Sequence, residues 1–192
     1  MFPDLTRDDV FRIETGRLWL RWPRARDASA IVRLAGERAV AETTGRIPHP
    51  IDPGGIDAFV VGARGTNAEG GGLVMGVSLR TDPDRLVGVI GIEPDADTGQ
   101  PHLGYWLGRP YWGRGLAREA AAAMVEAAFA YAGLPALTSS VMVGNDRSRR
   151  VLESCGFRAL GTATRFYPVR GGDRVIERFG LARAAWVDRP RG

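Results

Sequence analysis

The sequence predicts a mixed α/β domain, in which helices flank a largely antiparallel sheet. Three consecutive apolar segments, separated by turn sequences, are typical of an antiparallel meander. They are residues 73–80, 86–93 and 101–108. An apolar stripe at helical spacing follows over 116–131, and then the sequence reads as strand, short helix and terminal hairpin. A chain of 192 residues can bury one sizeable core, so we expect a single domain over 1–192.

The elements before the meander are less regular. RLWLRW (17–22) alternates in polarity and predicts a first strand. ARDASAIVRLAGE (25–37) has helical apolar spacing, and residues 38–57, which contain the prolines of PHPIDP, leave room for a second short helix. GTNAEGGG (65–72) predicts a mobile hairpin loop, because glycines and small polar residues favour turns.

After the meander, we expect a helix from Leu116 to Tyr131 and a strand over 136–143. Asn145 or Asp146 is expected to cap the following short helix, since both side chains accept hydrogen bonds from a helix N-terminus. The chain then ends in a hairpin that turns at residues 170–173.

The stretch YWGRGLAREAAAAM (111–124) places two glycines where a helix begins. Backbone N–H groups are unpaired at a helix N-terminus, and glycines let an anion approach them closely. Gly113 and Gly115, followed by the small Ala117, therefore suit phosphate, and Arg114 and Arg118 add positive charge. The alternative is a strand-to-helix turn without a ligand. The stretch is not a P-loop, and Arg118 stands where a dinucleotide fingerprint needs its third glycine.

Four stretches together resemble the GCN5-related N-acetyltransferases (the GNAT family), in particular the RimJ/RimL-like branch that acetylates ribosomal-protein N-termini. They are ETGRLWLR, HLGYWLGRPYWGRGLAREA, VGNDRSRRVLESCGF and IERFGLARAAW, which occur in the family's order. The resemblance covers residues 14–187. The resemblance implies one GNAT domain with splayed central strands and acetyl-CoA as the co-substrate. It also implies that the acceptor is a primary amine, namely the α-amine of a protein N-terminus.

The resemblance also implies where acetyl-CoA binds. The family's pyrophosphate loop has arginine or glutamine, then two residues, glycine, one residue, and glycine or alanine. It falls on Trp112, Gly113, Arg114, Gly115, Leu116 and Ala117. Trp112 replaces the usual arginine or glutamine, as is common in this branch. The splayed strands 101–108 and 136–143 would hold the pantetheine arm, with Trp106 and Leu107 among the cofactor-binding residues. Backbone N–H groups around Tyr105 to Leu107 would stabilise the oxyanion.

Residues 145–152 match further family positions. Asn145 matches an asparagine that faces the pantetheine arm, although a helix N-cap would explain it equally. Ser148 matches a small residue beside the cofactor thiol and is a catalytic candidate; otherwise it is an ordinary first-turn serine. Many relatives carry a tyrosine acid where this chain has Leu152, so that role is vacant or passes to another group or to water.

His102 is the candidate general base, since relatives often carry a glutamate there, near the acceptor amine. Histidine has a pKa of about 6.5 and can accept a proton at neutral pH. The alternatives are a strand-edge histidine without a catalytic role, or Glu93 acting through a water. Tyr105 and Trp106 fit the core or the wall of an acceptor pocket, and Cys155 fits a structural thiol.

Composition narrows the other classes. The formal charge is +4 and the pI about 9.9. All 26 basic residues are arginines, and apart from the group Arg147, Arg149 and Arg150 they are scattered, so we do not expect a nucleic-acid partner. With one cysteine and two histidines, a zinc site would need carboxylate ligands, and the chain has no HExxH-like spacing, so no metal site is expected. No apolar run approaches the ~20 residues of a membrane helix, and the N-terminus lacks the apolar segment of a signal peptide. We therefore expect a cytoplasmic protein and leave a homodimer open.

Three function classes remain open. A protein α-amino group has a pKa of about 7.7–8.0 and needs little help from a base, whereas lysine, at about 10.4, needs more. Because the sequence shows no clear acid/base pair, a protein N-terminus is favoured as the acceptor. A small-molecule acetyltransferase acting on antibiotics, polyamines or amino acids is the nearest alternative. A non-catalytic acyl-CoA-binding module is a third possibility, motivated by Leu152.

Overall fold

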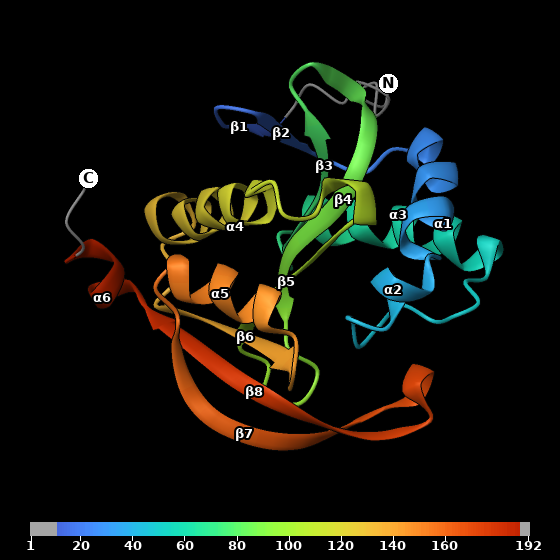
Figure 1. The fold of residues 1–192 in the computed structure, drawn as a ribbon. Helices are drawn as coiled ribbons and strands as arrows, with labels where there is room; N and C mark the ends of the chain where they lie inside the picture. The colour runs from blue at the N-terminus through green and yellow to red at the C-terminus, as the bar shows by residue number, and fades with distance from the viewer. Residues whose placement is uncertain (1–10, 189–192) are drawn as a thin grey trace.

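A computed structural model describes residues 11–188 of the chain, in which a single eight-stranded sheet runs through the molecule (Figure 1). The strand order is β1-β2-β3-β4-β5-β6-β8-β7. The strands are β1 Arg12–Glu14, β2 Leu18–Arg21, β3 Leu73–Leu79, β4 Asp82–Pro94, β5 Pro101–Leu107, β6 Ala136–Met142, β7 Arg158–Tyr167 and β8 Gly172–Ala182. All neighbours are antiparallel except the parallel pair β5 and β6, which confirms the predicted mixed sheet.

Helices cover both faces of this sheet. They are α1 Ala28–Ala35, α2 Arg38–Ala41, α3 Pro53–Glu69, α4 Leu116–Glu126, α5 Asp146–Ser154 and α6 Arg183–Val187. Short turns of other geometry are η1 Ala25–Asp27, η2 Arg109–Tyr111, the π-helical η3 Ala127–Tyr131 that continues α4, and η4 Pro168–Arg170. Within 11–188 no helix is long and apolar enough to cross a membrane. The expectations about the N-terminal ten residues and the last four lie outside the described part.

Two clusters of buried side chains identify the two faces of the sheet. The larger one contains Leu116 and Met124 of α4 and Leu152 of α5, and Leu103 and Leu107 of β5 pack into it. The smaller cluster lies under α1 and α3, and Trp106 packs against it. Because successive side chains of a strand point to opposite faces, β5 alternates between the two clusters.

The sheet opens between β5 and β6. β5 pairs with β4 along its whole length, from Pro94↔Pro101 to Gly88↔Leu107. With β6 it makes one pair in the described structure, His102↔Thr138, at the end where both strands begin. Since the strands are parallel and separate beyond this pair, a gap widens toward their C-terminal ends. This confirms the predicted splay.

One local prediction was wrong, because residues 65–69 belong to α3 and only the glycines after Glu69 form a turn. Asp52 caps the helix, its carboxylate accepting from the N–H groups of Gly54 (3.1 Å) and Gly55 (3.2 Å). The helix ends at Gly70 in the left-handed conformation, with φ +70°. Its glycines weaken the helical pattern, and burial of one face of the helix on the sheet compensates for them.

The β7–β8 hairpin reaches across to the segment between α2 and α3 (Figure 1). The guanidinium of Arg170, at its tip, donates to the carbonyls of Ala41, Thr44 and Ile47. One planar side chain thus donates to carbonyls at the end of α2 and in the segment after it, and it ties the tip of the β7–β8 hairpin to that segment.

Candidate acetyl-CoA site

The two glycines after β5 shape the entrance to α4. Gly113 and Gly115 have φ of +71° and +74°, a region that other residues rarely adopt. In the described structure no residue accepts a hydrogen bond from the N–H groups of residues 113–117, and Glu119 is the first to donate back, to the carbonyl of Gly115 (3.1 Å). These N–H groups lie at the positive end of the helix dipole. An anion would find several free donors here.

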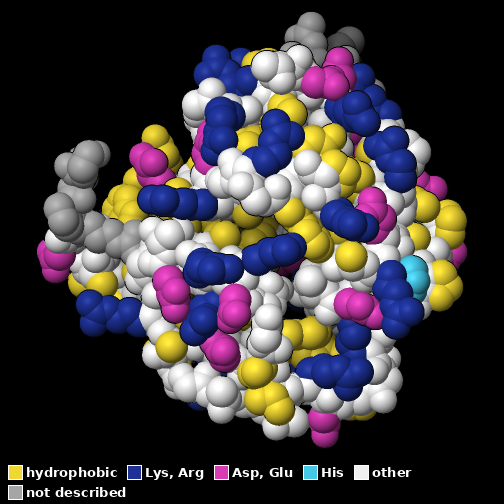
Figure 2. Space-filling view, viewed as in Figure 1, with side chains coloured by type: hydrophobic (Ala, Val, Ile, Leu, Met, Phe, Trp, Pro, Cys, Tyr) yellow, Lys and Arg dark blue, Asp and Glu magenta, His cyan; other side chains and the backbone are white. Residues whose placement is uncertain are grey.

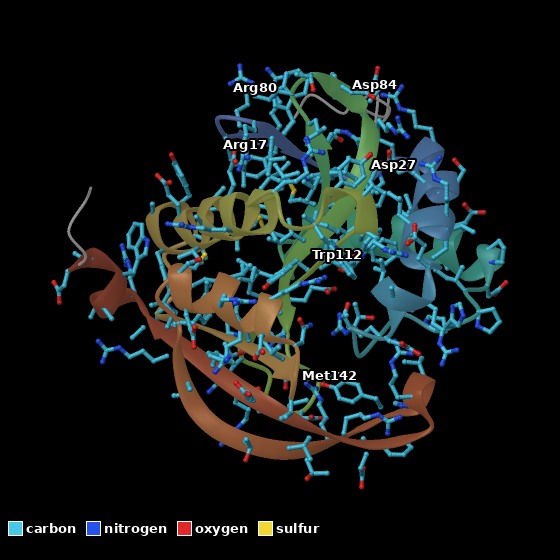
Figure 3. The ribbon with its side chains drawn as sticks, in the orientation of Figure 1. Arg17, Asp27, Arg80, Asp84, Trp112 and Met142 are labelled. Carbon is cyan, nitrogen blue, oxygen red and sulfur yellow. The ribbon has the colours of Figure 1, made fainter. Side chains whose placement is uncertain are left out.

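Trp112 joins this loop to the end of β5. Its indole Nε1 donates to the carbonyl of Leu107 at 2.7 Å. Across the gap, the guanidinium of Arg147 lies 5.2 Å from the Trp112 ring centroid, and Arg114 lies 6.0 Å from that of Tyr111. Figure 3 shows Trp112, which follows β5, well separated from Met142, which ends β6. Arginine side chains gather over α4, α5 and the loop on this face (Figure 2), which favours an anionic ligand.

A second set of contacts holds the loop and α4 against the turn between β1 and β2, and sequence reasoning missed it. The carboxylate of Glu119, on α4, accepts from the Thr15 hydroxyl (2.5 Å), the Arg17 backbone N–H (2.7 Å) and Arg17 Nε (2.6 Å). Arg17 Nη1 also donates to the carbonyl of Arg114 (2.9 Å). Burial alone would raise the pKa of Glu119, but these hydrogen bonds and the Arg17 charge hold the pKa below its ordinary value.

The gap between β5 and β6 presents free backbone groups. Thr138 and Ser139 donate their hydroxyls to the carbonyls of Pro101 (3.1 Å) and Leu103 (2.7 Å), so these carbonyls face β6. Because backbone direction alternates along a strand, the backbone N–H and C=O groups of Tyr105 and Leu107 face the same way. These backbone groups of Tyr105 and Leu107 point into the gap, and the Leu107 carbonyl accepts a hydrogen bond from Trp112 Nε1. A polar chain lying in the gap could form hydrogen bonds with the groups that are left, which are the N–H and C=O of Tyr105 and the N–H of Leu107.

The first turn of α5 borders the gap on its other side. Asn145 caps the helix, its Oδ1 accepting from the Ser148 N–H at 3.2 Å, as one of the two predictions for this residue had it. The Ser148 Oγ lies 2.8 Å from the hydroxyl of Tyr105, which projects from β5. Leu152 is fully buried in the larger cluster, and Cys155 is 3% exposed. Both side chains belong to the larger cluster.

His102 lies at the closed end of the gap, away from the glycine loop. Thr138 already gives its hydroxyl proton to the carbonyl of Pro101, so its Oγ1 accepts from His102 Nδ1 at 3.3 Å. Within residues 11–188 nothing hydrogen bonds to Nε2, so this tautomer leaves the Nε2 lone pair free. Burial lowers the pKa of His102 below its ordinary value, Asp95 opposes this, and Arg165 and Arg46 add to it.

The charged neighbours of His102 are themselves paired. Asp95 Oδ2 is 2.8 Å from Arg165 Nη1 and 3.8 Å from His102 Nδ1. Glu93, directly opposite His102 on β4, forms an ion pair with Arg46 (2.8 Å). Burial would raise the pKa of Asp95, but the hydrogen bond and charge of Arg165 hold it below its ordinary value. Glu93 therefore already has a cationic partner, while His102 has a free nitrogen.

The predicted site residues thus fall into three groups. Residues 112–117 with Leu107 lie together at the loop, and Asn145 and Ser148 face them across the gap. His102 lies at the gap's other end. The Trp106 side chain lies on the opposite face of the sheet, against the cluster under α1 and α3, and the structure does not bring it to the loop. The Leu116 side chain is buried in the core, so only its backbone is available.

Two cavities lie outside these groups. One of about 520 Å³ lies between β1 and α4 and is lined by Phe11, Ile13, Glu126 and Tyr131 among others. One of about 180 Å³ lies between the turn after α3 and η3, where Leu73 and Leu134 line it. No cluster of histidine, cysteine, aspartate and glutamate in the described part is suited to a metal ion.

Comparison with known proteins places this geometry in a family. The acetyltransferase (GNAT) domain profile matches residues 17–158, well over half of the chain. An uncharacterized N-acetyltransferase, p20, of Bacillus licheniformis is 29% identical over 97 residues, which are 50% of this chain and 53% of that protein. This chain thus spans about half the length of that curated relative.

Two solved structures have the same fold. The ribosomal-protein-S5-alanine acetyltransferase from Vibrio fischeri superimposes with a TM-score of 0.77 at 18% identity, covering 94% of this chain and 100% of that chain. The spermidine N-acetyltransferase from Vibrio cholerae, in complex with CoA and spermine, gives a TM-score of 0.74 at 16% identity, covering 91% and 100%. At these identities the likeness concerns the fold, and the matching domain profile supplies the family. The chain belongs to the GNAT acetyltransferase family.

Proposed function

We propose that this protein transfers the acetyl group of acetyl-CoA to a primary amine. The observation that carries the proposal is the run of free N–H donors at residues 113–117, which lies at the open end of the gap between β5 and β6. The pyrophosphate would bind these donors, with Arg114 and Arg118 nearby. The fit is supported by Gly113, because a Cβ added there would meet nothing within 4 Å, which leaves the approach open.

The gap suits the pantetheine arm. The amides of such a chain would pair with the Tyr105 and Leu107 backbone as an added strand would, and the Asn145 side chain lies on the opposite border. The thioester would then lie inside the gap, between the glycine loop and His102. The Tyr105 N–H, which faces the gap nearer to His102, is the candidate donor to the oxyanion.

His102 is the proposed general base. The neutral amine attacks the thioester carbonyl, a C–N bond forms, and His102 Nε2 accepts the proton that the nitrogen must lose. The electron pair of the breaking C–S bond stays on sulfur. Nδ1 remains bonded to Thr138 Oγ1, so the ring keeps its orientation during the transfer.

For the acceptor, we propose a protein N-terminal α-amine, as the RimJ/RimL-like motifs imply. The free base at His102 has a lowered pKa, and such a weak base is adequate for an α-amine at about 7.7–8.0 but poorly matched to lysine at about 10.4. A small-molecule amine is the second candidate, because the fold is shared with a protein named as a spermidine acetyltransferase as well as one named for a ribosomal protein.

The test has two stages. Calorimetry with acetyl-CoA and with desulpho-CoA measures binding, and thiol release is then followed with N-terminal peptides, polyamines, aminoglycosides and free amino acids. Release with peptides that have a free α-amine, and none with their N-terminally blocked forms, would support the proposal. Release with polyamines or antibiotics alone would select the second candidate. Binding without release on any amine would identify a non-catalytic acyl-CoA-binding module.

A further inference from the structure

A hydrogen bond between the Tyr105 and Ser148 side chains crosses the gap on the side nearer the glycine loop. The Tyr105 hydroxyl lies 2.8 Å from Ser148 Oγ and 3.2 Å from the Ser148 carbonyl. Tyr105 belongs to β5 and Ser148 to the first turn of α5, so the contact joins the two borders of the proposed thioester site. Both side chains are half-buried.

The Tyr105 and Ser148 hydroxyls have one proton each, which limits how their hydrogen bonds can be arranged. A carbonyl can only accept, and a tyrosine hydroxyl has one proton to give. Both contacts are therefore satisfied together when Tyr105 donates to the Ser148 carbonyl and accepts from Ser148 Oγ. In the alternative arrangement Tyr105 donates to Oγ, and the Ser148 proton becomes free to point elsewhere. Two rotating hydroxyl hydrogens separate these states, and no charge is created.

Tyr105 is poorly suited to give its proton away. Burial is the main cause that raises its pKa above the ordinary value of about 10, while the hydrogen bond to Ser148 opposes the rise. An alkyl thiol, represented by cysteine, has a pKa of about 8.5. Transfer of the tyrosine proton to a departing thiolate would therefore be uphill, whereas a hydrogen bond from a neutral donor costs no proton transfer.

We propose that Tyr105 is a positioning residue that releases the Ser148 hydroxyl to stabilise the departing CoA thiolate. As the C–S bond breaks and sulfur takes the electron pair, Tyr105 turns its hydrogen from the Ser148 carbonyl to Ser148 Oγ. Ser148 turns its own hydrogen to the sulfur. Both hydroxyls stay protonated, and the thiolate takes a proton from water after it leaves. The pair supplies the function that Leu152 cannot, and the inference rests on the proposed function.

The first test measures bound CoA, without catalysis. Stabilisation of the thiolate lowers the pKa of the bound CoA thiol, which is read from ultraviolet absorbance between pH 6 and 9 as the difference between CoA and desulpho-CoA complexes. We expect this pKa to be about one pH unit higher in Tyr105→Phe and in Ser148→Ala than in the unmodified protein. The same pKa in all three proteins would overturn the proposal. Absence of CoA binding in the unmodified protein would instead overturn the proposed function.

The second test is a double-mutant cycle on turnover. Tyr105→Phe keeps the ring and should lower kcat about tenfold, with the acetyl-CoA Kd changed less than twofold. Because the two hydroxyls act as a unit, the double variant should be no slower than Ser148→Ala. Reductions that multiply would contradict the mechanism, as would an unaltered kcat in Tyr105→Phe.

A matched control separates this role from packing. Tyr131→Phe makes the same chemical change at a tyrosine that is 80% exposed, at the far end of η3. It should leave kcat and the bound-thiol pKa unaltered. Urea unfolding of each variant establishes that the proteins compared are folded. If Tyr105→Phe is folded and its kcat falls only as much as that of the control, Tyr105 has a packing role and the proposal is wrong.

Discussion

The indole N–H of Trp112 donates to the carbonyl of Leu107 at 2.7 Å, across the turn that joins β5 to α4. The contact satisfies the Leu107 carbonyl and leaves the Leu107 N–H as the Leu107 backbone group that can bind a ligand in the gap. It also fixes the loop of free N–H groups relative to the strand that borders that gap. Trp112 therefore positions the loop, a role that its place in the family's pyrophosphate-loop motif did not indicate.

Replacing Trp112 with phenylalanine should weaken acetyl-CoA binding. The change removes the donor, leaves the Leu107 carbonyl unpaired and releases the loop, at a cost of about 1–2 kcal/mol, or roughly 5–30-fold in Kd. Calorimetry measures the affinity. Trp19→Phe is the matched control, because the Trp19 Nε1 has no hydrogen-bond partner in the described structure. Equal affinities in the two variants would count against the role of Trp112.

Gly115→Ala should separate stability from binding. Both Gly115 and Gly133 have positive φ, +74° and +66°, so alanine at either costs about 1–2 kcal/mol of unfolding free energy. Only Gly115 lies at the proposed pyrophosphate site. We expect urea unfolding to show similar losses for Gly115→Ala and Gly133→Ala, and calorimetry to show at least tenfold weaker acetyl-CoA binding for Gly115→Ala alone. Equal binding in both would contradict the assignment of the loop.

His102→Gln should lower turnover in a pH-dependent manner. A base acts in its neutral form, which dominates above its pKa, and the His102 pKa lies below 6.5 because of burial. The ratio of wild-type to variant kcat/KM removes the ionisation of the amine, which is common to both enzymes. We expect this ratio to be constant, at about 100-fold, above pH 6.5 and to fall at lower pH.

Asp95→Asn refines this experiment. The Asp95 charge raises the His102 pKa and opposes the effects of burial, Arg165 and Arg46. Its removal should move the acidic inflection of the profile to still lower pH. If the ratio for His102→Gln shows no acidic inflection, then His102 is not the base.

Glu119→Gln should make stability less dependent on pH. The pKa of Glu119 is depressed in the folded protein, so its stabilisation is complete above the unfolded value near 4.5 and is lost as pH falls through the folded pKa. We expect the variant to be about 1–2 kcal/mol less stable at pH 7, and the difference to shrink below pH 4.5. Urea unfolding across this range measures it. Glu126→Gln, at an exposed position on the same helix, should show little difference at any pH.

Much of the fold follows from local patterns. The meander, the helix that begins at Leu116 and a short helix capped by Asn145 or Asp146 were all predicted, because alternation, helical spacing and caps act over a few residues. The structure selects Asn145 as the cap. α3 was missed, since its glycines weaken the local signal and its burial against the sheet is a property of the whole fold. The Thr15–Arg17–Glu119 network was also missed, because Glu119 lies about a hundred residues after Thr15 and Arg17 in the sequence and no local pattern links them.

The sequence by itself determined that glycines precede α4, the order of the helices and strands, and the motifs that indicate the GNAT family. These depend on backbone conformation and short-range spacing, which a linear chain displays directly. Only the tertiary structure decided that the pairing of β5 with β6 lies at His102 and Thr138, that Tyr105 meets Ser148 across the gap, and that Trp106 faces the other side of the sheet. Such relationships arise when distant segments pack and must satisfy their polar groups together, and no local pattern encodes that outcome.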